Sequence, residues 1–83
     1  MSIYIGKRPK QDYKYKEFGR RLDDAMFRQD ISNQELAQEM YVAASTISGY
    51  RTGRRSPKVD DLARLAKILH VSADYLLGLS NEP

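Results

Sequence analysis

The sequence of 83 residues contains no cysteine, only one histidine and no long apolar run. The lack of cysteine excludes disulfide bonds and thiolate metal sites, and one histidine alone does not make a metal site. No window approaches the roughly 18 apolar residues that a membrane-spanning helix needs. The first residues, MSIYIGKRPK, lack the apolar core and cleavage site of a signal peptide. We therefore expect a cytoplasmic protein with no metal, no cofactor and no membrane partner.

Catalytic patterns are missing as well. No glycine-rich phosphate loop occurs, and the scattered serines have no evident general base. Acid pairs such as Asp60 and Asp61 are chain neighbours that point apart on a helix, and His70 falls near a predicted helix end, where a cation complements the dipole. No small-molecule ligand is evident, and the chain is not expected to be an enzyme.

The formal charge of +3 is small, but the charges are unevenly placed. Most of the fourteen basic residues fall within 7–21 and 51–58, whereas most of the eleven acidic residues lie elsewhere. This distribution predicts basic patches on an otherwise acidic body, which suits a polyanionic partner. Solvated faces that only keep the protein soluble are the alternative, and composition alone does not decide between them.

From Phe18 onward, apolar residues recur at helical spacing and predict four short helices and a shorter fifth. Ser32 and Glu35 are spaced as a capping box at the start of the second helix, and Asp30 tolerates the left-handed backbone that would end the first. Gly53 is expected to end the third helix.

The fourth and fifth helices have signals of their own. Pro57 is placed in the first turn of the fourth helix, followed by acids near the positive end of its dipole. Ser72 can cap the fifth helix and Gly78 can end it.

The length fits one domain with one modest core. We place a basic arm at residues 1–16, the helical domain at 17–79 and a tail at 80–83. Asp12 could cap an early start of the first helix. The arm is a disordered terminus, a segment along a nucleic-acid backbone, or a strand paired with another copy.

The second and third predicted helices are joined by a very short connection. Leu36 and Met40 lie one turn apart on the second helix, and Ile47 and Tyr50 share a face of the third, so all four can meet in one core. So short a turn forces a steep crossing, and Ala37 is the small residue where the two backbones approach. This is the helix-turn-helix pattern, whose second helix lies in the major groove of DNA.

Four fragments in order carry a family resemblance: FGRRL, ISNQELAQEM, STISGYRTGRRSP and LARLAKILHVSADYLLG. Together they resemble the Cro-like phage repressor family, the xenobiotic-response-element-type regulators, from Phe18 to Gly78. The resemblance implies a compact, all-α, five-helix lambda-repressor-like DNA-binding domain. Such proteins usually act as dimers on a two-fold operator.

Three residues depart from the family pattern. Tyr41 stands where the family has glycine in the turn, and a bulky residue in the left-handed region costs roughly 1–2 kcal/mol. Ala43 replaces a serine or threonine cap, which forfeits roughly 1 kcal/mol. Arg51 stands where the family usually has glutamate, and this added charge favours a phosphate backbone.

The resemblance maps base contacts to Ala44, Ser45 and Gly49. Alanine can touch a thymine methyl, serine can form one hydrogen bond to either kind of base, and Gly49 removes bulk so that the helix can approach the groove floor. None of the outward residues can make the bidentate contacts that identify guanine or adenine. The full set expected to face the bases is Ala44, Ser45, Thr46, Ser48 and Gly49.

Most of the affinity for DNA is expected to come from groups that flank this helix. The family position that hydrogen-bonds phosphate corresponds to Asn33 and Gln34, at a helix N-terminus. The residues expected to contact phosphate are Asn33, Gln34, Arg51, Thr52, Arg54, Arg55 and Lys58, and the arm residues expected to reach a minor groove are Lys7, Arg8 and Lys10. Ordinary helix-start polarity and a solvated loop are the alternatives.

The sequence therefore predicts a sequence-specific transcriptional regulator, expected to be a repressor. A homodimer would insert helix 44–52 into the major groove of double-stranded DNA at a two-fold operator. Leu77 and Leu79 either form the dimer surface or complete the core. The alternative function is a protein-binding module with the same fold, such as an antitoxin or antirepressor.

Overall fold

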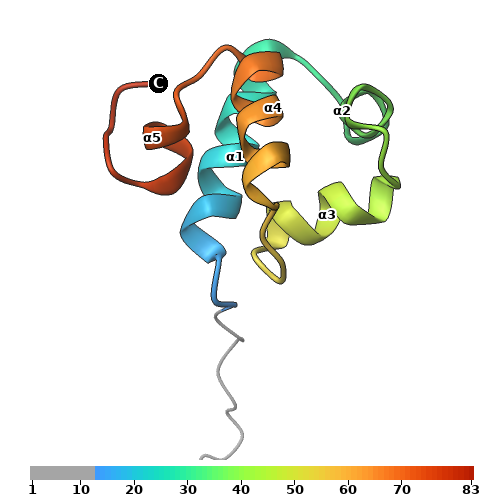
Figure 1. Cartoon of the computed structure of the whole chain (residues 1–83), viewed down its shortest axis with the longest axis horizontal. Helices are drawn as coiled ribbons and strands as arrows, with labels where there is room; N and C mark the ends of the chain where they lie inside the picture. The colour runs from blue at the N-terminus through green and yellow to red at the C-terminus, as the bar shows by residue number, and fades with distance from the viewer. Residues whose placement is uncertain (1–12) are drawn as a thin grey trace, which may run out of the picture.

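A computed structural model describes residues 13–83 (Figure 1). Within that range the chain forms five helices and no strand, which confirms the expected all-α fold. The helices are α1 (Lys16–Gln29), α2 (Asn33–Met40), α3 (Ala44–Thr52), α4 (Val59–Leu69) and α5 (Ala73–Leu77). The predictions for Lys7, Arg8, Lys10 and Asp12 fall outside the described residues.

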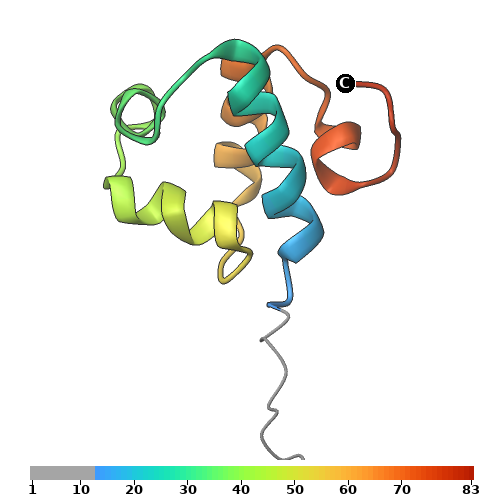
Figure 2. The same cartoon turned by 180° about the vertical axis from the view of Figure 1, so that it is seen from behind.

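Helix α1 is the centre of the fold. It packs against α3, α4 and α5, while α2 packs against α3 and α4. In Figure 1, α1 and α4 lie side by side, with α2 and α3 on one side of them and α5 on the other; Figure 2 shows the same arrangement from behind. No helix within residues 13–83 combines the length and the apolar character needed to span a bilayer.

The core draws large apolar side chains from every helix. Leu36, Met40, Ile47 and Tyr50 are all buried, as the helix-turn-helix pattern predicts, and Ala37 is buried with them. The side chains that are fully enclosed are Leu22, Leu36, Met40, Ile47, Leu65, Leu69 and Leu76. Burial of this apolar surface is the main force that holds such short helices in place.

The helix starts mostly follow their sequence signals. The Glu35 backbone N–H donates to Ser32 Oγ at 3.1 Å and the Ser32 N–H donates to Glu35 Oε1 at 2.9 Å, so the capping box is complete. Ser72 Oγ accepts from the Tyr75 N–H at 2.9 Å. Ala43 provides no side-chain cap for α3, as expected.

The placement of Pro57 in the first turn of α4 is wrong. Helix α4 begins at Val59, and Lys58 is its N-cap with an extended backbone (φ −66°, ψ 165°). Pro57 therefore belongs to the loop before the cap. Asp60 and Asp61 do occupy the first turn, where the helix dipole favours negative charge.

The start of the folded domain also differs from the predicted boundary of the arm. The Tyr15 N–H donates to the Gly53 carbonyl at 3.0 Å, and the Tyr15 side chain packs against the core. Because α1 begins at Lys16, residues 15 and 16 belong to the helical domain. At the other end, Arg21 donates to the carbonyls of Tyr75 at 3.1 Å and Ser80 at 2.9 Å, which fastens α5 and the tail to α1.

All five helices end at a residue in the left-handed conformation. Gly53 and Gly78 adopt this conformation without a steric penalty. Asp30 (φ 53°), Tyr41 (φ 59°) and His70 (φ 56°) adopt it at a steric cost. The left-handed Asp30 is as predicted. At Tyr41 the ring is 88% exposed, so no packing of that side chain offsets the backbone strain.

Replacing Tyr41 by glycine should therefore stabilise the domain. We expect the free energy of unfolding to rise by about 1 kcal/mol, measured by urea titration followed by circular dichroism, because glycine removes the left-handed penalty at a helix C-terminus. The control is Tyr41→Ala, which removes the exposed ring and keeps the strain. An equal gain for alanine would show that the ring, and not the backbone, is the source of the effect.

Candidate nucleic-acid interface

Helix α3 presents small side chains to solvent. Ile47 and Tyr50 point inward and are buried, while Ser45 is exposed and Ala44 and Thr46 are partly exposed. Alanine, serine and threonine leave the backbone of α3 close to whatever surface the helix meets. Ser45 therefore lies on the outward face, whereas Ala44 also packs against the core, and base contact by these residues stays a prediction.

Gly49 differs from the expectation. It is buried, and a Cβ placed on it would lie 2.8 Å from Cγ and 2.9 Å from Cδ of Arg55. The cause is the turn after α3, in which the N–H groups of Arg54 and Arg55 both donate to the Gly49 carbonyl, at 3.0 and 3.3 Å. The missing side chain of Gly49 therefore makes room for the stem of Arg55, and Gly49 does not lie on an open surface.

Asn33 and Gln34, which the sequence grouped together, have different environments. The Gln34 side chain is exposed, forms no hydrogen bond with any described residue, and lines a hollow of about 200 Å³ with Val42 and Ala44. Asn33 is partly buried, and its amide is fully used. Its Nδ2 donates to Ser48 Oγ at 2.8 Å and to the Ala44 carbonyl at 3.4 Å. Gln34 therefore remains a candidate phosphate ligand, whereas Asn33 and Ser48 bond to each other.

Arg51 and Thr52 also bond within the domain. Arg51 Nη1 donates to Asn33 Oδ1 at 2.7 Å, and Arg51 Nε forms an ion pair with the carboxylate of Asp23 on α1. The Thr52 hydroxyl donates to the Gly49 carbonyl at 3.2 Å. Asp23 is a residue that the sequence analysis missed, because nothing in the local pattern indicates a partner 28 positions further along the chain.

The loop after α3 holds exposed cations. Arg54, Arg55 and Lys58 are exposed and form no ion pair with any residue from 13 to 83. Burial raises the pKa of the Tyr50 hydroxyl, Asp61 raises it further and Arg55 opposes that shift. The Arg55 side chain passes next to Gly49, so its charge lies near the end of α3.

The arginines of α1 form ion pairs instead. Arg20 and Arg21 pair with Glu17, and Arg28 pairs with Asp24. These hydrogen bonds lower the pKa of the Glu17 carboxyl. Within residues 13–83, the cations of the site that form no ion pair therefore follow the C-terminal end of α3, while Gln34 of α2 lies near Ala44 at the N-terminal end of α3.

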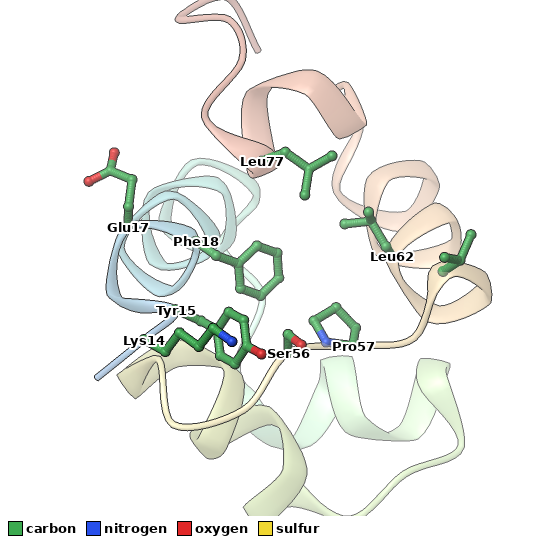
Figure 3. Close-up of a pocket in the computed structure, with 9 residues that line it drawn as sticks. Lys14, Tyr15, Glu17, Phe18, Ser56, Pro57, Leu62 and Leu77 are labelled. Carbon is green, nitrogen blue, oxygen red and sulfur yellow. The ribbon is translucent and has the colours of Figure 1, made fainter. Parts of the chain in front are cut away.

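An apolar groove of about 520 Å³ lies beyond this loop. Figure 3 shows Leu77, Leu62, Pro57 and Phe18 around the opening, so α5, α4, the loop and α1 each supply a wall. Leu77 is 52% exposed and Leu79 is 74% exposed, which rules out the alternative that both complete the core. The residues that line the groove are Lys14, Tyr15, Glu17, Phe18, Ser56, Pro57, Val59, Leu62 and Leu77.

Gly19 is a second residue whose role the sequence analysis did not identify. A Cβ on Gly19 would lie 2.8 Å from the carbonyl oxygen of Tyr50 and closer still to that of Arg51. The backbones of α1 and α3 therefore meet at this glycine. The fragment FGRRL contributed to the family resemblance, but only the packing shows why a residue without a side chain is needed there.

Comparisons with known proteins agree with this geometry. A family model described as helix-turn-helix matches residues 26–76. The HTH-type transcriptional regulator ImmR of Bacillus subtilis is 33% identical over 60 residues, which are 72% of this chain and 47% of ImmR. The chain spans about half the length of the curated relatives it matches first.

Solved structures give the same result. The DNA-binding domain of the P22 C2 repressor has a TM-score of 0.71 and 26% identity, covering 84% of this chain and 95% of that one. SinR, a master regulator of biofilm formation solved in complex with DNA, has a TM-score of 0.66 and 28% identity, covering 72% of this chain and 97% of that one. The family match contains all of α2 and α3, and it agrees with the expectation of a non-enzymatic protein. It confirms the resemblance to Cro-like phage repressors, and this chain belongs to the helix-turn-helix family.

Proposed function

We propose that this protein is a DNA-binding transcriptional regulator, acting as a repressor, that inserts α3 into the major groove of a two-fold operator. The observation that carries the proposal is the surface around α3, where the outward side chains are small. The Gln34 side chain lies at one end of α3 and Arg54 and Arg55 at the other, and none of these side chains is hydrogen-bonded to or ion-paired with another residue from 13 to 83. ImmR is named as a transcriptional regulator and SinR was solved on DNA, which supports the same role here. A role in binding DNA also agrees with the expected cytoplasmic location.

Base selection by α3 would be modest. Ala44 can contact a thymine methyl and Ser45 can form one hydrogen bond, but neither makes a bidentate pair. Gln34, Arg54, Arg55 and Lys58 would bind the backbone on both sides of the groove. Affinity would therefore depend strongly on salt, and specificity would depend in part on DNA shape.

The test is to measure binding of a labelled duplex at several salt concentrations. Replacing both Arg54 and Arg55 by alanine should weaken binding to every duplex by about the same factor and lower the slope of log affinity against log salt by about 2, because each phosphate contact contributes about one unit. Arg64→Ala with Lys67→Ala is the control, since it removes the same charge from α4. An equal fall in slope for this control would assign the effect to net charge.

We also propose that the protein binds its operator as a homodimer that meets at the apolar groove. Two-fold DNA sites are read by two copies of a helix whose half-sites lie about 34 Å apart or a multiple of that distance. The groove adjoins the loop that carries Arg54, so a second copy seated there would lie next to the same DNA surface. Leu77 would then be covered. Analytical ultracentrifugation with and without an inverted-repeat duplex tests this: a single monomer on a full operator would contradict it.

A protein-binding module such as an antitoxin or antirepressor is the second candidate. It is favoured by the ring of Tyr41, 88% exposed at the turn between α2 and α3. Duplex binding separates the two functions. The module would bind duplex weakly and without sequence preference, whereas the regulator would select one sequence from a random library.

A further inference from the structure

Four polar side chains, partly exposed at the surface, join three helices along one side of α3. Asp23 comes from α1, Asn33 from the start of α2, and Ser48 and Arg51 from α3. Arg51 donates to both Asp23 and Asn33, and Asn33 donates to Ser48. We call this cluster the three-helix clamp.

The clamp holds α3 along most of its length. The Asn33 amide reaches the carbonyl of Ala44 at 3.4 Å, the hydroxyl of Ser48 at 2.8 Å and the guanidinium of Arg51 at 2.7 Å. These three positions lie on one side of the helix, about one turn apart. A rotation of α3 about its axis, or a slide along it, would break at least one of these directional bonds.

Apolar packing alone fixes this rotation less well. The large buried side chains of α3 are only Ile47 and Tyr50, and the rest of the helix is small or polar. Two anchors near the middle and end of a nine-residue helix leave its first turn without a large buried side chain. The Asn33 contact with Ala44 lies in that first turn, directly before Ser45, which is proposed to face the bases.

We propose that Asn33 and Arg51 are positioning residues that set the rotation of α3, and so the direction in which Ala44 and Ser45 approach the base edges. This inference rests on the proposed function, and it assigns to both residues a role other than phosphate contact. The side-chain amide of Asn33 and two of the three guanidinium nitrogens of Arg51 already have partners inside the protein. The side chains of Gln34 and Arg54 have no hydrogen-bond partner within residues 13–83.

The two roles give different signatures in DNA binding. Loss of a phosphate ligand weakens all duplexes by a similar factor and lowers the salt slope by about one. Loss of a positioning residue reduces the preference for the best duplex over a scrambled one and leaves the slope unchanged. We expect a roughly tenfold loss of preference, the effect of losing about one charge-assisted hydrogen bond.

The experiment uses the full chain and the best duplex selected from a random-sequence library, with a scrambled duplex as reference. Arg51→Met, which keeps the apolar stem, should lose preference at constant slope. Asp23→Ala, which removes the acid of the clamp and leaves Arg51 in place, should lose preference as well. A phosphate ligand at position 51, freed from its acid, would instead bind every duplex more tightly.

The outcomes separate cleanly. A fall in slope with unchanged preference for Arg51→Met, or an unchanged preference for Asp23→Ala, would overturn the proposal. Should Arg51→Met fail to fold, Asn33→Ala breaks the clamp without a change of charge and must show the same loss of preference. Arg54→Ala is the matched control and should show the opposite pattern, a lower slope at constant preference. A wild-type chain that selects no sequence would refute the proposed function, which is a different result.

Discussion

Replacing Gly19 by alanine is expected to lower the free energy of unfolding by about 3 kcal/mol, near the upper end of the range for overpacked cores. The added methyl group would lie 2.8 Å from the carbonyl oxygen of Tyr50 and nearer still to that of Arg51. Both atoms are backbone, so neither can rotate away, and α1 and α3 must separate. A chain of this length has roughly 4–12 kcal/mol of stability in total, so the loss is large. Urea unfolding followed by circular dichroism measures it.

Gly49→Ala is the matched control for this variant. Both glycines are buried within helices, and alanine favours a helix over glycine by up to about 1 kcal/mol at either position. The methyl group at position 49 would meet only the flexible stem of Arg55, 2.8 Å away at Cγ, which can move into solvent. We expect Gly49→Ala to be neutral or slightly stabilising. If both variants lost the same stability, the close approach of α1 and α3 at Gly19 would not be the cause.

The contrast between the two glycines shows what the sequence could and could not predict. Caps at Ser32 and Ser72, the left-handed Asp30 and the buried pair Ile47 and Tyr50 depend on neighbours within a few positions, so periodicity and capping rules were enough. The role of a glycine depends on which atoms approach it from elsewhere in the fold. Local rules contain no such information.

The candidate site divides along the same line. The helix pattern and the family resemblance were enough to predict that Ser45 is exposed on α3 and that Arg54 is an exposed cation. Asn33 and Arg51 carry the same chemical groups as good phosphate ligands, but Asp23 on α1 takes up the charge of Arg51. Only the packing of α1 against α3 shows this pairing, because the two residues are far apart in the sequence.

Replacing Gly53 by alanine should have the largest effect of all, a loss of about 4 kcal/mol in the free energy of unfolding. Gly53 ends α3 with φ 89°, where a side chain costs roughly 1–2 kcal/mol. A Cβ there would also lie 2.6 Å from both N and Cα of Lys16, and backbone overlap of this kind adds about 1–3 kcal/mol. The first turn of α1 would have to move, which breaks the hydrogen bond from the Tyr15 N–H to the Gly53 carbonyl.

Gly78→Ala separates these two contributions. Gly78 has nearly the same backbone conformation (φ 83°), but the nearest atoms to its Cβ would be side-chain atoms of Arg21 and Glu17 at 3.9 Å. It should therefore lose only the conformational part, about 1 kcal/mol. The difference between the two variants measures how firmly the first turn of α1 holds the end of α3. Equal losses would mean that this contact is loose, and α3 would then be held at its C-terminal end by Arg51 and Tyr50 alone.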